Sequence, residues 1–241
     1  MFGKNEITKP TKVYVGYLNV NSIFYTIQGE GPFAGVPALF IRLQGCNLQC
    51  SFCDTEFSSG VPYDLEELLG EVKKSSIAHQ TCVSPLVVIT GGEPLLQADI
   101  ARLVKGLVDE GYRVQIETAG TVFPIELENR LNVRFYGSAV TIVCSPKTKH
   151  LNKRIIPYIN AYKYVLQEGF ICSADGLPYF SSDQDLVAKV ARPVIGAEVY
   201  VMPCDAHDVE KNKKNIEAVV EVSQKFGYRL CLQLHKIVNV E

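Results

Sequence analysis

The stretch "VPALFIRLQGCNLQCSFCDT" (residues 36–55) joins a continuous apolar run to a loop that carries three cysteines. The run at 36–43 is typical of a strand that is buried on both faces, as in a parallel sheet. Cys46, Cys50 and Cys53 follow it closely. A disulfide uses two cysteines and tetrahedral zinc normally takes four ligands, so three thiols in one loop indicate an incomplete metal-binding set.

The rest of the chain alternates between strand-like and helical patterns. Further strand-like runs occur at 86–90, 113–118, 140–145, 161–166, 198–203 and 229–235. An apolar stripe from Ile100 to Val108, ended by Gly111, predicts a helix, and so do residues 65–72 after the N-cap candidate Asp64. Another helix is predicted at about 208–226, before Gly227. Apolar strands separated by helices favour an α/β fold with a parallel sheet. There are too few units for an eight-stranded barrel, so we expect a partial, open one.

Chemically distinctive motifs follow several of these strands. "TGGEP" (90–94), "ETAG" (117–120), "CSPK" (144–147) and "MP" (202–203) each lie at the end of a predicted strand, as the cysteine loop does. In open and closed α/β barrels, sites form at the carboxyl ends of the strands. These motifs are therefore expected to surround one common mouth.

Composition limits the classes of function. The 241 residues are 47% apolar and 21% charged, which suits one globular domain. The formal net charge of −2 gives no sign of nucleic-acid or membrane binding, and no run of about 18 apolar residues occurs. We expect a cytoplasmic protein. Cys144, Cys204 and Cys231 lie in or beside apolar runs and are expected to be small core residues.

The clustered thiols leave two metal chemistries open. In a reducing compartment they are metal ligands rather than disulfide partners. A 4Fe–4S cluster held by three cysteines keeps one iron free to bind another molecule. Structural zinc is the alternative, with His79 or Cys82 as a distant fourth ligand.

The C-x3-C-x2-C spacing, with Phe52 before the last cysteine, resembles the radical S-adenosylmethionine (SAM) superfamily. "TGGEP" is similar to the glycine-rich motif of that superfamily, which holds the SAM amino group. The resemblance implies a 4Fe–4S cluster on Cys46, Cys50 and Cys53, with SAM bound at its free iron. It also implies a 5′-deoxyadenosyl radical that abstracts hydrogen from the substrate. The fold implied is a reduced, open (β/α)6-type barrel.

A longer stretch narrows the resemblance. "FYTIQGEGPFAGVPALFIRLQGCNLQCSFCDTEF" (24–57) is similar to the 7-carboxy-7-deazaguanine synthase family, and "VVITGGEP", "QIETAGT", "CSPK" and "LQLHKIVNVE" follow in order. The family implies conversion of 6-carboxy-5,6,7,8-tetrahydropterin to 7-carboxy-7-deazaguanine, with ring contraction and loss of ammonia, in the pathway to queuosine. It also implies a homodimer, an external electron donor such as flavodoxin, and a free pterin rather than tRNA as substrate.

Several residues suit that substrate. Gln28 and Glu30 offer an amide and a carboxylate on a glycine-flanked loop. Arg42 lies in an apolar strand and needs a partner, either a substrate carboxylate or an ion pair with Glu30. The resemblance adds further substrate contacts: Ile27, Gly29, Thr90, His235 and the terminal Glu241.

The resemblance assigns the remaining ligands. It implies Mg2+ at Thr55, and SAM contacts at Phe52, Gly92, Glu117, Ser145, Pro146 and Lys147. The predicted organisation is one domain, 1–241, with a substrate loop and strand at 12–35, a core barrel at 36–203, and a terminal helix and strand at 204–241. Two other functions stay open: that of an activase of glycyl-radical enzymes, which shares the cysteine spacing, and that of a non-catalytic zinc-binding module.

Overall fold

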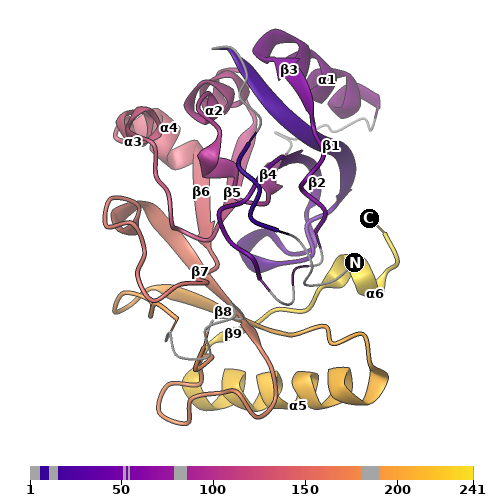
Figure 1. Ribbon diagram of the computed structural model, residues 1–241, viewed down its shortest axis with the longest axis vertical. Helices are drawn as coiled ribbons and strands as arrows, with labels where there is room; N and C mark the ends of the chain where they lie inside the picture. The colour runs from indigo at the N-terminus through magenta and orange to yellow at the C-terminus, as the bar shows by residue number, and fades with distance from the viewer. Residues whose placement is uncertain are drawn as a thin grey trace.

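The computed structural model describes residues 6–10, 16–50, 53, 55–78, 86–180 and 190–240 (Figure 1). One sheet of nine strands organises these residues. Its strands are β1 (Tyr17–Ile27), β2 (Pro37–Leu43), β3 (Val61–Asp64), β4 (Leu86–Gly91), β5 (Arg113–Thr118), β6 (Val140–Cys144), β7 (Ile159–Leu166), β8 (Glu198–Pro203) and β9 (Arg229–Leu230).

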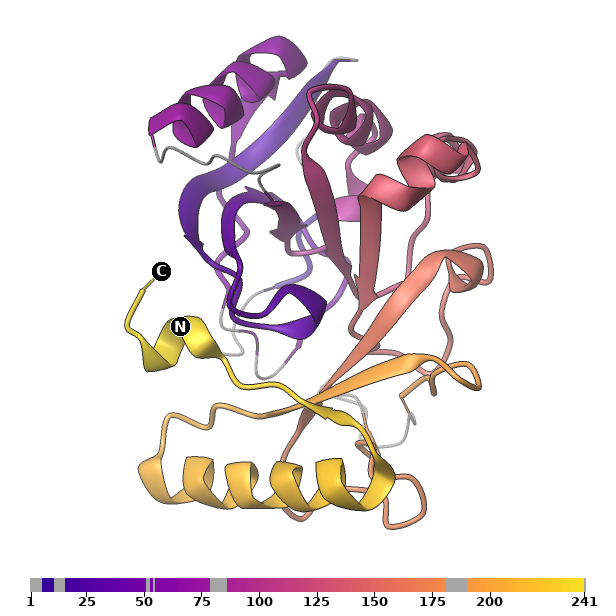
Figure 2. The ribbon, with the colours of Figure 1, turned by 180° about the vertical axis from the view of Figure 1, so that it is seen from behind.

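The strand order is β3-β1-β2-β4-β5-β6-β7-β8-β9, so β3 and β9 are open edges and the sheet does not close. From β2 onward, neighbouring strands are parallel, whereas β1 pairs antiparallel with both β2 and β3. The predicted partial, open α/β barrel is confirmed. In both ribbon views the sheet curves around a central space, with helices on its outside (Figures 1 and 2).

The helices are α1 (Leu65–Ala78), α2 (Ile100–Asp109), α3 (Ile125–Leu131), α4 (Arg134–Ala139), α5 (Val209–Phe226) and α6 (Leu234–Ile237), and 3-10 turns cover Gly31–Phe33, Pro94–Leu96 and Ile156–Tyr158. The predicted caps are confirmed. Asp64 accepts a hydrogen bond from the Glu67 amide at 2.8 Å. Gly111 and Gly227 have φ angles of +88° and +71°, which glycine adopts without a steric penalty.

The packing explains why these segments form. Leu103, Val104 and Leu107 lie on the inward face of α2 and are fully buried with Val87 and Ile89 of β4. A second buried cluster joins β7, β8 and α5. The cysteines expected in the core, Cys144, Cys204 and Cys231, are indeed buried. Of the described helices, none combines the length and apolar character needed to cross a bilayer.

The last predicted strand, 229–235, is wrong beyond its first residues. β9 covers only Arg229–Leu230, and His235 lies in the short helix α6. The chain leaves the sheet because it binds another partner. The Leu234 amide donates to the Gly29 carbonyl at 3.3 Å, and Gln233 Nε2 donates to Glu30 at 3.0 Å. Figure 2 shows this C-terminal segment passing from the lower strands toward the loops after β1.

Candidate functional site

A cavity of about 410 Å3 lies on the inner face of the sheet. It brings together most of the predicted site residues: Ile27, Gln28, Glu30, Arg42, Cys46, Cys50, Cys53, Thr55, Thr90, Gly92, Glu117, Ser145, Lys147 and His235. Gly29 and Pro146 do not line it, although Gly29 contacts the C-terminal segment. Phe52 and Glu241 lie outside the described residues. The motifs at the strand ends therefore share one mouth, as the sequence predicts.

The two-residue period of the strands selects which side chains enter the cavity. Phe24 and Thr26 of β1 line it, and so do Phe40 and Arg42 of β2, because alternate side chains share one face. Arg42 is paired in register with Thr90 of β4. The sheet thus presents a guanidinium and a hydroxyl side by side on the inner face.

The cysteine loop is fixed at its start. The amide and the carbonyl of Cys46 both bond to Thr8, at 2.7 and 2.9 Å, and the Gly45 amide donates to the Phe57 carbonyl at 2.9 Å. A Cβ placed on Gly92 would overlap the Gly45 carbonyl oxygen and lie 2.6 Å from Cys46 Cβ. Gly92 of "TGGEP" is therefore needed for close contact between the two motifs.

Burial sets the state of the Cys46 thiol. Desolvation raises the pKa of Cys46 to about 12, and the nearby Glu93, Cys50 and Cys53 also raise it. A thiol of this kind stays protonated at neutral pH until a metal displaces the proton. None of the described cysteines forms a disulfide.

The three thiols line the cavity without forming a compact single-ion site. Among the residues that the structure describes, no group of three or more His, Cys, Asp and Glu could hold a metal ion. A 4Fe–4S cubane places its thiolates on separate irons, so its sulfurs need not converge on one point. The donor set of three thiols fits such a cluster. His79 and Cys82, the fourth ligands of the zinc alternative, lie outside the described residues.

Glu93 links the motifs around the cavity, a role that the sequence alone did not indicate. Its carboxylate is fully buried and accepts hydrogen bonds from the Thr118 hydroxyl and the Ala119 amide, both at 2.8 Å. Its amide donates to Gly45 at 2.9 Å. Burial raises the pKa of Glu93 to about 7 in spite of these bonds. Glu93 thus joins "TGGEP" to both "ETAG" and the cysteine loop.

Arg42 has an unsatisfied donor in the cavity. Its Nε is buried and has no hydrogen-bond partner among the residues that the structure describes, while its guanidinium lies 5.1 Å from the centroid of the Phe24 ring. The alternative ion pair with Glu30 is not formed, because Glu30 bonds to Lys163 and Gln233 instead. A buried donor of this kind costs free energy unless a ligand satisfies it. The geometry favours an anionic ligand beside Arg42.

Lys163 is a second residue that the sequence reasoning missed. It lies in β7, and its Nζ is 2.5 Å from Glu30 Oε2 and 3.5 Å from Glu117 Oε2. Burial lowers the pKa of Lys163, but the two carboxylates outweigh burial, so its pKa is raised. Burial raises the pKa of Glu30, but Lys163 and Gln233 hold it down at about 2. The only signal in the sequence was one lysine in the apolar run "AYKYVL".

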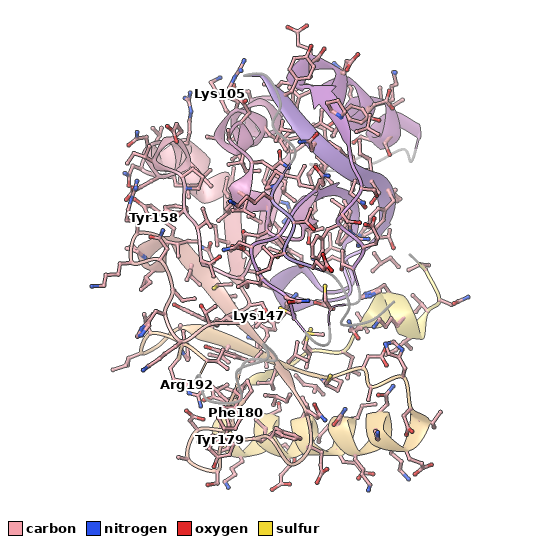
Figure 3. All side chains as sticks on the ribbon, viewed as in Figure 1. Lys105, Lys147, Tyr158, Tyr179, Phe180 and Arg192 are labelled. Atoms are coloured by element: carbon pink, nitrogen blue, oxygen red, sulfur yellow. The ribbon has the colours of Figure 1, made fainter. Side chains whose placement is uncertain are left out.

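The "SPK" motif is anchored to the neighbouring strand. The Ser145 amide donates to the Thr118 carbonyl at 2.8 Å, and Lys147 Nζ lies 2.6 Å from Ser145 Oγ. Burial lowers the pKa of Lys147 below its usual value, and the opposing effect of the nearby Cys50 is smaller. Figure 3 labels Lys147 near the middle of the molecule.

The C-terminal segment completes the wall. A Cβ on Gly29 would overlap His235 Nδ1, so the "QGEG" loop and α6 are in close contact. Thr55, two residues after Cys53, also lines the cavity and supplies a hydroxyl.

Comparison with known proteins gives the family. The Radical SAM superfamily profile matches residues 40–139. The 7-carboxy-7-deazaguanine synthase of Rhodospirillum rubrum is 40% identical, with both chains covered completely. That of Rickettsia prowazekii is 36% identical over the whole of this chain and 96% of its own. The crystal structure of QueE from Escherichia coli matches in fold, with a TM-score of 0.61 at 21% identity, covering 90% of this chain and 94% of that one.

Proposed function

This chain belongs to the 7-carboxy-7-deazaguanine synthase family of radical SAM enzymes, and we propose that it converts 6-carboxy-5,6,7,8-tetrahydropterin to 7-carboxy-7-deazaguanine. The reaction contracts a ring and releases ammonia. It would serve a pathway to queuosine or another 7-deazapurine. The observation that carries the proposal is Arg42, which lines a cavity with three thiols and whose buried Nε has no partner among the described residues, because this guanidinium suits an anionic ligand.

A 4Fe–4S cluster and SAM are the cofactors of this superfamily. The cluster would be held by Cys46, Cys50 and Cys53, whose thiols line the cavity. When bound, the cluster and SAM would together supply a 5′-deoxyadenosyl radical for hydrogen abstraction. The protein excludes water and fixes the reactants in place.

The SAM site would use groups beside the cluster loop. Gly92 offers backbone at a point where a side chain does not fit, and Ser145 and Lys147 offer polar groups on the next wall. Pro146, Phe52 and Glu117 complete the set that the family resemblance assigns. Glu117 already accepts hydrogen bonds from Gln28 and Gln115, at 3.0 and 2.9 Å, which holds its carboxylate in one orientation.

The substrate would bind between Arg42 on one side of the cavity and the Glu30–Lys163 pair on the other. Arg42 would hold its carboxylate with a planar fork of donors, and Thr90 lies beside it in the sheet. Gln28 and Glu30 would face the polar edge of the pterin, with the backbone of Ile27 and Gly29 close by. His235 and the carboxylate of Glu241 would close the C-terminal side.

Three parts of the proposal rest on the family. Mg2+ would bind the Thr55 hydroxyl, the substrate and water, because Mg2+ prefers oxygen ligands and keeps several waters. There it would orient the substrate carboxylate and neutralise its charge. We also propose a homodimer and an external electron donor such as flavodoxin.

The chain would act as one domain, with the 12–35 and 204–241 segments completing the barrel of 36–203.

The test is turnover under anaerobic conditions. Reconstituted protein with SAM, dithionite, Mg2+ and the tetrahydropterin is expected to form 7-carboxy-7-deazaguanine, and omission of Mg2+ is expected to slow it. The Cys50→Ala variant is expected to form neither deoxyadenosine nor deazapurine. If the wild type forms deoxyadenosine but no deazapurine, the assignment of the substrate is wrong. If the active preparation contains zinc in place of iron and sulfide, the assignment of the 4Fe–4S cluster is wrong.

A further inference from the structure

Lys163 lines the cavity between two carboxylates, and no sequence motif explains its role. Its side chain is 8% exposed, and those of Glu30 and Glu117 are 14% and 20% exposed. A buried lysine is costly unless it is paired, so a lysine at this place indicates that the pairing has a use. Three charges in a poorly solvated cavity also act more strongly than they would in water.

Neutral donors fix each carboxylate from other sides. Glu30 Oε1 accepts from Gln233 Nε2 at 3.0 Å, and Glu30 Oε2 accepts from Lys163. Glu117 Oε1 accepts from the amides of Gln28 and Gln115 at 3.0 and 2.9 Å. Each carboxylate has about four acceptor positions, so both keep acceptor capacity after these contacts.

The free acceptor positions at this wall favour a ligand edge made of donors. Two carboxylates surround the Lys163 ammonium, and Lys147 lines the same cavity close enough to interact with Glu30 and Lys163. The carboxylates keep free acceptor positions although their charges are balanced by nearby cations. Arg42 places a positive charge on another strand of the same cavity. A molecule with an anionic group at one end and N–H donors at the other would match both walls.

We propose that Lys163 is a positioning residue that holds Glu30 and Glu117 as a pair of acceptors for the 2-amino edge of the substrate's pteridine ring. On this assignment Glu117 faces the substrate and is not one of the SAM contacts. The inference rests on the proposed function, and it adds the determinant that selects 2-aminopteridines over 2-oxopteridines. In a 2-oxo analogue, an acceptor oxygen replaces the amino donors and faces the carboxylates. A site built for donors rejects such an analogue because its own polar groups are left unpaired.

The test measures a ratio of affinities. Holoenzyme with SAM and Mg2+ is titrated anaerobically with 6-carboxypterin and with 6-carboxylumazine, its 2-oxo analogue. The wild type is expected to prefer the pterin by about a hundredfold or more. Lys163→Met is expected to reduce that ratio at least tenfold, and Lys163→Arg to restore most of it, because arginine keeps the cation. Lys105→Met, which removes an exposed lysine paired with Asp109 on α2, is the control and should leave the ratio unchanged.

A partly unfolded variant lowers both apparent affinities equally, so the ratio separates positioning from general stability. If Lys163→Met keeps the wild-type ratio, the inference is wrong even when the enzyme turns over the pterin. If Lys163→Arg loses the ratio as fully as Lys163→Met does, the cation is not what positions the carboxylates. If the wild type binds neither compound, the inference fails, and turnover of the tetrahydropterin decides the proposed function separately.

Discussion

Replacement of Arg42 by methionine should separate activity from stability. Methionine has a similar length and no charge, so Arg42→Met removes the buried Nε, for which the described part of the chain offers no hydrogen-bond partner. If that donor exists to bind a substrate carboxylate, the variant should lose catalysis while its fold stays intact.

The size of both effects follows from the contacts. A bidentate, charge-assisted pair contributes about 3 kcal/mol, which corresponds to a loss of about 150-fold in kcat/KM. On the stability side, removal of an unsatisfied buried donor relieves about 1 kcal/mol or more. Loss of the contact with Phe24, at 5.1 Å, costs about 0.5–1 kcal/mol. The two nearly cancel, so Tm should stay within about 4 °C of the wild type.

The assay pairs steady-state kinetics with thermal unfolding of the substrate-free protein. Arg113→Met is the matched control, because Arg113 also lies over a phenylalanine, Phe33 at 5.3 Å, but is exposed and outside the cavity. The control should keep the wild-type kcat/KM. A Tm lowered by more than about 8 °C in Arg42→Met, with kcat/KM unchanged, would refute a substrate role and make Arg42 a structural residue.

Three further changes test other parts of the site. Burial raises the pKa of Glu93 from 4.5 to about 7, so its contribution to stability is full below pH 4.5 and is lost as the pH rises through 7. Metal-free Glu93→Gln should therefore lose less unfolding free energy between pH 5 and pH 8 than the wild type, by an amount on the order of 3 kcal/mol; equal slopes would contradict the raised pKa. Gly92→Ala should displace the Gly45–Cys46 backbone and lower the iron content after reconstitution. The control is Gly70→Ala in α1, where an added Cβ meets nothing within 4 Å, and it should keep the wild-type iron content. Wild-type iron content in both variants would show that the loop tolerates the Cβ. Cys50→Ala should lose the cluster absorbance. Cys144→Ala, which removes a fully buried thiol, should retain it. Loss of the absorbance in both variants would contradict the assignment of Cys50, and not Cys144, as a cluster ligand.

The sequence predicted those parts of the fold that local pattern determines. Strand β2 and strands β4 to β8 are largely apolar runs because helices and the cavity side chains cover both faces of the sheet. The caps at Asp64, Gly111 and Gly227 were predictable because each depends only on nearby backbone.

Features that depend on distant contacts were missed. The predicted strand 229–235 ends early because Gln233 and Leu234 bond to the "QGEG" loop, which lies about two hundred residues earlier in the chain. β3 was not predicted either, because it is a four-residue edge strand with two exposed residues and a proline. The roles of Lys163 and Glu93 could not be predicted, because each depends on a partner from a distant part of the chain, Glu30 and Thr118 respectively.

If ring contraction of a carboxylated tetrahydropterin takes place in this cavity, ammonia and 7-carboxy-7-deazaguanine form together. Their stoichiometry in anaerobically reconstituted enzyme tests this directly. One ammonia is expected for each deazapurine, with neither formed by Cys50→Ala. Deoxyadenosine that accumulates while no ammonia is released from the pterin would contradict it.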